Sequence, residues 1–180
     1  MEKKARILSD KSELSGGDYL FLISCTQILK AERERYKQVF VIHESDVPYG
    51  RGWSPLAWQI LEGESDIVIT LMEAADSVDS GDVFAKKTLN LNGTELADEI
   101  HQKCALVKIE LMEMAVAGDI ERVAQTGEPS YYRRRVPEDS RIDIEKSLKS
   151  QFNLLRICEP RFPAFFEYLG SRYEVSVRKT

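Results

Sequence analysis

The chain has 180 residues, of which 43% are hydrophobic and 31% are charged, a balance typical of one globular domain with a sizeable core. Its formal net charge of −5 and its isoelectric point of about 5.2 give it no average attraction for a polyanion, so nucleic acid is not the expected partner. No apolar run approaches the length of a membrane span and the start is not a signal peptide, so we expect a cytoplasmic protein without membrane contact.

The beginning of the chain predicts a parallel strand–helix–strand unit. Residues 1–5 are typical of the last turn of a helix, and "RILSD" at residues 6–10 is typical of a short strand. The apolar run at residues 19–25 predicts a strand covered on both faces, and "QVFVI" at residues 38–42 predicts a second. The charged segment between them, residues 26–37, predicts a helical crossover, which makes parallel pairing of the two strands the expected arrangement.

A compact helix and two strands are expected next. Ser54 as an N-cap and Pro55 in the first turn predict a helix that Gly63 ends. Residues 66–74 and 83–91 predict two strands, joined by the turn "DSVDSGD".

A long helix follows, capped by Thr94 or Asn92 and ending at Gly118. His101 lies beside its apolar stripe and is interpreted as a surface or boundary residue. The stripe recurs every three or four positions, at Leu96, Ile100, Cys104, Val107, Leu111 and Met114.

The pattern weakens from Pro129 onwards. A basic, proline-containing stretch leads to a short amphipathic piece at residues 143–157 and to an aromatic tail with a final edge strand at Tyr173, Val175 and Val177. We therefore expect a catalytic domain over residues 1–128 and a C-terminal extension, residues 129–180, that packs on it. The cysteines show no metal-ligand spacing, so we expect reduced, buried thiols and no metal site: Cys25, Cys104 and Cys158.

His43 and Asp79 are the candidates for chemistry. His43 ends the second apolar strand, and ligands of open α/β sheets bind outside the carboxyl ends of the strands. Asp79 lies in the turn between the two later strands, which can fold over the same edge. A carboxylate beside an imidazole sets its tautomer and supports its charged form, so the two residues are a plausible proton-handling pair.

The residues around this pair resemble a known family. "HESDVPYGRG" at residues 43–52 resembles the His-x-Ser-x-x-Pro loop of the folate-dependent formyltransferases, the methionyl-tRNA formyltransferase-like proteins, and "VDSGDVF" at residues 78–84 resembles their Asp-x-Gly turn. The similarity is strong over residues 40–91 and weaker through the tail. "GRGWSPLAWQILEG" is most similar to the branch that formylates amino groups of nucleotide-linked sugars, precursors of surface polysaccharides.

The resemblance implies an α/β, Rossmann-like fold with a partly parallel sheet flanked by helices, and transfer of a formyl group from 10-formyltetrahydrofolate to an amine. His43 would contact the developing oxyanion or move the proton of the amine, and Asp79 would orient His43. The implied residues around the folate are Ser45, Pro48, Gly50 and Gly81. The implied residues around the small-molecule acceptor are Trp53, Arg133 and Arg134.

The sequence departs from the family at two places. The family carries an Asn two residues before the His, as an oxyanion donor, where this chain has Val41. Its fold also begins with a strand–helix–strand unit ahead of the region around Arg6, and we expect the first strand and helix to be missing here. The open sheet edge that this leaves, with the aromatic tail, makes a homodimer a plausible state. Two alternatives stay open: a formyltransferase-like binding protein with impaired catalysis, and a methionyl-tRNA formyltransferase.

Overall fold

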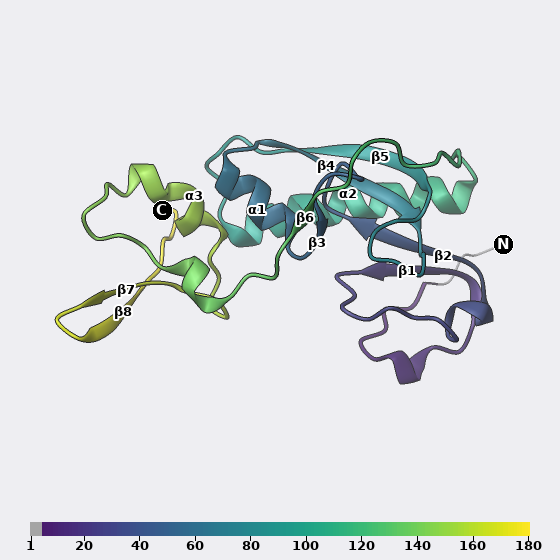
Figure 1. Ribbon diagram of the computed structural model, residues 1–180, viewed down its shortest axis with the longest axis horizontal. Coiled ribbons are helices and arrows are strands. Elements are labelled where there is room, and N and C mark those ends of the chain that lie inside the picture. Colours follow the sequence, from purple (N-terminus) through teal and green to yellow (C-terminus); the bar gives the residue numbers. More distant parts are fainter. Residues whose placement is uncertain (1–4) are drawn as a thin grey trace.

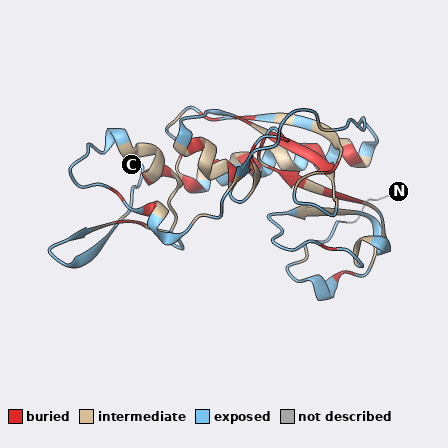
Figure 2. Cartoon of the chain, in the orientation of Figure 1, coloured by how far each residue is buried: buried red, intermediate tan, exposed pale blue. Residues whose placement is uncertain are grey.

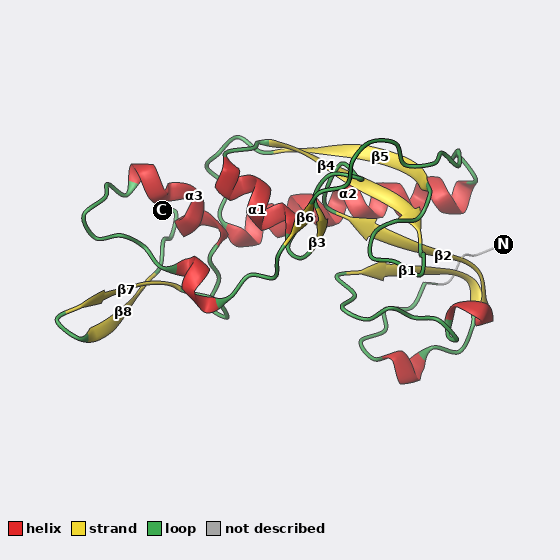
Figure 3. Cartoon of the chain, in the orientation of Figure 1, coloured by secondary structure: helices red, strands yellow, loops and turns green. Residues whose placement is uncertain are grey.

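The centre of the molecule is a mixed four-stranded sheet. The computed structural model describes residues 5–180, and its sheet has the order β1-β2-β4-β5. These strands are β1 (Gly17–Ile23), β2 (Tyr36–His43), β4 (Asp66–Glu73) and β5 (Val83–Asn90). β1 and β2 are parallel, whereas β2, β4 and β5 pair antiparallel. The predicted α/β fold with a partly parallel sheet is confirmed (Figures 1 and 3).

The core lies between this sheet and the long helix α2 (Ala97–Ala117), which packs on β4 and β5. Ile100, Cys104 and Leu111 of the predicted stripe are buried there. Figure 2 shows many of the buried residues on the sheet and on α2. Gly118 ends the helix as predicted, with a positive φ of 81°. The predicted cap is wrong, because the helix begins after Leu96, whose N–H donates to the Glu99 carboxylate 2.8 Å away.

The connection from β1 to β2 is not the predicted helix. Residues 24–35 contain one short 3₁₀ turn, η2 (Arg33–Arg35), and Leu29 is the one residue among them that is buried. Helix propensity alone does not hold a short segment without an apolar face to pack, so the charged run stays irregular. β1 lies at the described edge of the sheet, with Tyr19 and Ile23 each 43% exposed, and is therefore not covered on both faces as predicted.

The strand predicted for residues 6–10 is also absent, and Ile7 is 98% exposed. The helical turn predicted for residues 1–5 lies almost wholly outside the described residues. Cys104 is buried as predicted, whereas Cys25 is exposed and Cys158 is partly exposed. No helix in residues 5–180 has the length and apolarity needed to cross a membrane.

The C-terminal residues extend the molecule beyond helix α1 (Pro55–Glu62), on the side away from the N-terminal segment (Figure 1). β6 (Tyr131–Tyr132) pairs with β3 (Arg51–Gly52), and α3 (Phe152–Ile157) packs on α1 and α2. The predicted final strand is β8 (Ser171–Val175), which forms a hairpin with β7 (Ala164–Tyr168). The remaining elements are short 3₁₀ turns: η1 (Lys11–Glu13), η3 (Pro137–Ser140) and η4 (Lys149–Gln151).

A buried ion pair fastens α3 to the start of α2. The side chains of Arg156 and Glu95 are 2% and 4% exposed, and their Nη2 and Oε2 atoms lie 3.0 Å apart. Arg156 Nε also donates to the Glu95 carbonyl over 2.8 Å, and Lys103 pairs with the other carboxylate oxygen. Because both charged groups are buried, separating them would leave an unpaired buried charge, and the pair therefore holds α3 in one position against α2.

Candidate active site

His43 and Asp79 come together at the end of β2. Imidazole Nδ1 lies 3.6 Å from Asp79 Oδ2, and the two side chains are 7% and 12% exposed. His43 is the last residue of β2, and Asp79 belongs to the turn between β4 and β5. The antiparallel register places the end of β4, at Glu73, opposite Phe40 of β2, so the turn that follows has to fold back along β2 to bring Asp79 to His43.

The other ring nitrogen of His43 also has a protein partner. Nε2 lies 2.9 Å from the carbonyl oxygen of Gly50. Because a carbonyl oxygen only accepts, Nε2 is the donor and carries a hydrogen. A substrate that hydrogen-bonds to Nε2 must therefore displace the Gly50 carbonyl, which makes the loop after β2 part of the site.

The turn that carries Asp79 is held in an unusual backbone conformation. Asp79 has a positive φ of 49°, in a backbone region that residues other than glycine rarely occupy. Its carboxylate Oδ2 accepts the N–H of Gly52 over 2.9 Å. The same oxygen therefore faces His43 and fastens the loop after β2.

Gly81 makes this turn possible, and Gly81→Ala tests that. A Cβ at Gly81 would lie 1.9 Å from the carbonyl oxygen of Glu73, whereas a Cβ at Gly17 would meet Tyr36 side-chain atoms at an ordinary 3.6 Å. We expect Gly81→Ala to lower the free energy of unfolding by about 2 kcal/mol and Gly17→Ala to change it by less than about 0.5 kcal/mol, measured by urea denaturation. Equal stability of the two variants would contradict the close approach.

The loop after β2 leaves one buried hydroxyl free beside the pair. Ser45 is 2% exposed, its carbonyl accepts from Thr70 Oγ1 over 2.7 Å, and its Oγ has no hydrogen-bond partner among the described residues. Gly50 has a positive φ of 68°, and a Cβ there would lie 2.9 Å from the Tyr132 ring and 3.0 Å from Ser45 Cβ. The loop therefore needs glycine at this position.

The residues expected around the acceptor directly follow the paired strands β3 and β6 in the chain. Arg133 lies over the Trp58 ring and donates two hydrogen bonds to Asp139, which hold the pKa of that carboxyl below its usual value. Arg134 lies over Trp53, 5.0 Å from the ring centroid, and forms no ion pair within residues 5–180. Arg134 is therefore the free cation of the two, and Trp53, 38% exposed, is accessible beside it.

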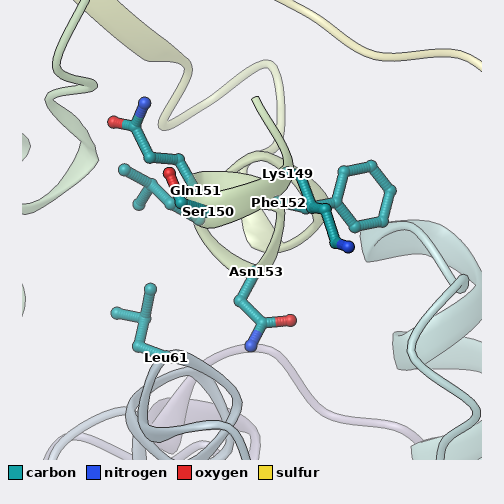
Figure 4. A pocket seen from close by; sticks show the side chains of 7 residues that line it. Leu61, Lys149, Ser150, Gln151, Phe152 and Asn153 are labelled. Carbon is teal, nitrogen blue, oxygen red and sulfur yellow. The ribbon is translucent and has the colours of Figure 1, made fainter. Parts of the chain in front are cut away.

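Two cavities lie elsewhere on the molecule. One, of about 640 Å³, is lined by Leu61 of α1 and by Lys149–Leu154, as Figure 4 shows. The other, of about 370 Å³, lies between β5 and the end of α2. Neither cavity is lined by His43 or Asp79. A ligand that binds to the pair therefore has to move the Gly50 carbonyl away from His43 Nε2.

Comparison with known structures identifies the fold. No protein-family model matches the sequence. Methionyl-tRNA formyltransferase from Clostridium thermocellum matches with a TM-score of 0.80 and 26% identity, over 96% of this chain and 80% of that one. The chain therefore has the formyltransferase fold.

Two further solved structures share the formyltransferase fold. A 4-N formyltransferase from Francisella tularensis matches with a TM-score of 0.71 and 20% identity, over 89% of this chain and 70% of that one. HypX from Aquifex aeolicus in complex with tetrahydrofolic acid matches with a TM-score of 0.73 and 23% identity, over 92% of this chain and 30% of that one.

Val41 occupies the strand position at which the motif expected from the sequence has an Asn. Alternate residues of a strand share a face, so the side chains of Val41 and His43 lie on the same side of β2. Val41 pairs with Leu22 of β1 and Met72 of β4 and is partly buried. An isopropyl group donates no hydrogen bond, so an oxyanion on this face has to take its donors from elsewhere.

Three residues of the site were not found from the sequence. Ser130 Oγ accepts the N–H of Gly50 over 2.8 Å, and the Arg51 guanidinium donates to Gln125 Oε1 over 2.7 Å. Ser130 lies 80 residues after Gly50, and Gln125 lies 74 residues after Arg51. No local pattern marks them, and the turn formers Gly127 and Pro129 between them are the one signal that the sequence offers.

Proposed function

We propose that the chain transfers a formyl group from 10-formyltetrahydrofolate to the amino group of a nucleotide-linked amino sugar. The observation that carries the proposal is the contact of His43 with Asp79 at the end of β2, in a chain with the formyltransferase fold. Together with the motif "HESDVPYGRG" it supports formyl transfer, and the acceptor class is inferred from charge and from the surface around Trp53.

The proposed reaction forms a bond between the amine nitrogen and the formyl carbon and breaks the bond from that carbon to N10 of the folate. The amine loses a proton, N10 gains one, and the formyl oxygen carries negative charge in between. His43 would move the proton or contact this oxygen once the Gly50 carbonyl has left Nε2. Each donor preorganised on such an oxygen is typically worth about 3 kcal/mol, so the donors that replace an Asn at Val41 matter.

The remaining residues take roles that their positions support. We propose that Ser45, Pro48, Gly50 and Gly81 shape the folate side, where the free Ser45 hydroxyl offers a hydrogen bond. Arg134 and Trp53 would receive the nucleotide, the guanidinium on phosphate and the indole against a ring. Arg133 would contribute through its backbone and its stacking on Trp58, because Asp139 already neutralises its charge.

The acceptor is proposed to be a small nucleotide sugar and not a tRNA. The net charge of −5 opposes a long polyanion, and the only concentrated run of positive residues in the sequence is "RRR" at residues 133–135. We propose that residues 1–128 form the catalytic unit and that residues 129–180 complete its acceptor side through β6.

An assay of folate-dependent formylation tests this function. The folded chain is incubated with 10-formyltetrahydrofolate and a panel of amino-sugar nucleotides, and release of tetrahydrofolate and the mass of the formylated sugar are followed. We expect turnover with at least one nucleotide-linked amino sugar and none with the free sugar phosphate. Turnover with methionyl-tRNA alone, lost at high salt, would instead establish the tRNA function.

A binding protein without catalysis is the second candidate, favoured by Val41 and by the Gly50 carbonyl on His43 Nε2. It predicts no turnover and no change on His43→Ala. If it has also lost the folate site, folate causes no thermal shift, whereas a ligand at a hundredfold its Kd stabilises a site by about 2.7 kcal/mol. A thermal shift with turnover excludes it.

A further inference from the structure

The side-chain amide of Gln125 contacts both loops that form the His43–Asp79 pair. Its Nε2 donates to the Asp79 carbonyl over 3.0 Å and to the Gly81 carbonyl over 2.7 Å. Its Oε1 accepts from Arg51 Nη2 over 2.7 Å. One amide therefore spans from the turn between β4 and β5 to the loop after β2.

These bonds complete a closed circuit of contacts. The Asp79 carboxylate accepts the N–H of Gly52, the residue next to Arg51, while Arg51 donates to Gln125 and Gln125 donates back to the Asp79 carbonyl. Removing Gln125 would leave the Gly52 N–H as the one hydrogen bond that ties Asp79 to the loop after β2 within residues 5–180. Without Gln125, no side-chain amide would fix the backbone of Asp79 while its carboxylate holds the loop after β2.

The segment that carries Gln125 is itself fixed against the sheet. Val123 forms a two-way backbone bridge with Val83, with both N–H···O distances 2.8 Å, and the N–H of Glu121 donates to the Phe84 carbonyl. Gln125 follows this bridge and is partly buried. Its amide is therefore anchored from β5, at the point where the Asp79 turn leads into that strand.

The conformation of Asp79 explains why such an anchor is needed. A non-glycine residue at a φ of 49° is strained, and strained residues persist where surrounding contacts over-determine them. The carbonyls of Asp79 and Gly81 both belong to this turn, and the Gln125 amide binds both. We propose that Gln125 is a positioning residue that sets the Asp79 carboxylate against His43, an inference that rests on the proposed formyl transfer for its kinetic consequence.

The kinetic test replaces Gln125 with methionine, which keeps the length of the side chain and removes both donors and the acceptor. We expect kcat to fall by about ten- to a hundredfold, as for other residues that orient a reacting group, while KM for folate and acceptor changes by less than about twofold. In an Asp79→Ala background, Gln125→Met should lower kcat little further, because both changes act through the Asp79 carboxylate. Gln102→Met, the same change on the exposed face of α2, should leave both constants unchanged.

A second measurement tests the geometry without any activity. The chain has two histidines, so ¹⁵N-histidine labelling gives two ring systems, and His101→Gln identifies that of His43. We expect Gln125→Met to move the Nδ1 resonance of His43, in the same direction as Asp79→Asn, and to leave His101 unmoved. A lower Tm with unmoved His43 resonances would show a purely structural role and overturn the proposal. Moved resonances in a protein without turnover would uphold the positioning role and count against the formyl transfer instead.

Discussion

His43→Ala is expected to lower kcat for formyl transfer by about a hundredfold to ten-thousandfold, the range that a positioned general acid or base contributes. The imidazole lies 3.6 Å from the Asp79 carboxylate, and no other histidine lies in the site, since His101 is exposed on α2. Steady-state kinetics at saturating folate and acceptor measures the change. KM should change far less than kcat, because the imidazole acts mainly on the charge that develops during transfer.

Two controls make this result specific. His101→Ala removes the other imidazole and should leave kcat unchanged. Circular dichroism checks that His43→Ala is folded, because the change also removes the partner of the Gly50 carbonyl. A folded His43→Ala protein that turns over at the wild-type rate would show that the pair takes no part in catalysis.

Glu95→Ala is expected to lower the free energy of unfolding by about 3 to 5 kcal/mol, the cost of leaving a buried charge without its partner. Arg156 is 2% exposed, and after this change its guanidinium keeps the backbone carbonyl of residue 95 but loses the carboxylate. Urea denaturation measures the difference. Glu110→Ala, also on the α2 side of the molecule, removes an exposed pair with Lys87 and should cost less than about 1 kcal/mol. Equal losses for the two variants would contradict the structural role of the buried pair.

The same carboxylate predicts how stability depends on pH. Burial by itself raises the pKa of Glu95, but hydrogen bonds from Lys103 and from the N–H of Asn92 outweigh it and hold the pKa at about 2, below the ordinary glutamate value of 4.5. A group whose pKa is lowered by folding stabilises the folded state above its unfolded pKa. The contribution is therefore complete above pH 4.5 and is lost as the pH falls towards 2. Glu95→Gln should remove this part of the acid destabilisation, measured by urea denaturation at about pH 5 and about pH 3.

The parts of the fold that were predicted correctly are those with a local signal. The apolar runs of β2 and β4 and the stripe of α2 at Ile100, Cys104 and Leu111 are largely buried as their patterns indicate, whereas β5 forms where predicted but has Leu89 as its one buried residue. Pro55 and Gly63 mark the ends of α1, because these signals depend on neighbouring residues alone. Ser54 precedes the helix as predicted, but it makes no side-chain cap hydrogen bond and has a positive φ of 51°. The contact of His43 with Asp79 could be predicted for a different reason. Both residues lie in motifs whose residue spacing resembles that of the folate-dependent formyltransferases.

The failures share a physical cause, which is that they depend on packing between distant segments. The charged run before β2 has helix propensity, but beyond Leu29 it presents no apolar face that the sheet covers, so no helix forms. β1 has the composition of a covered strand, yet nothing in its own residues says that it lies at the edge of the described sheet. Gln125 and Ser130 reach the site across more than seventy residues of chain, a distance over which sequence spacing carries no information.

A crystal structure with 5-formyltetrahydrofolate, a stable analogue of the proposed formyl donor, shows directly whether the folate binds at the His43–Asp79 pair. We expect the pterin to lie against the loop after β2, the Gly50 carbonyl to have moved away from His43 Nε2, and the formyl group to lie within hydrogen-bond reach of the imidazole. A folate bound in the cavity between Leu61 and Lys149–Leu154, with the Gly50 carbonyl still on His43, would contradict it.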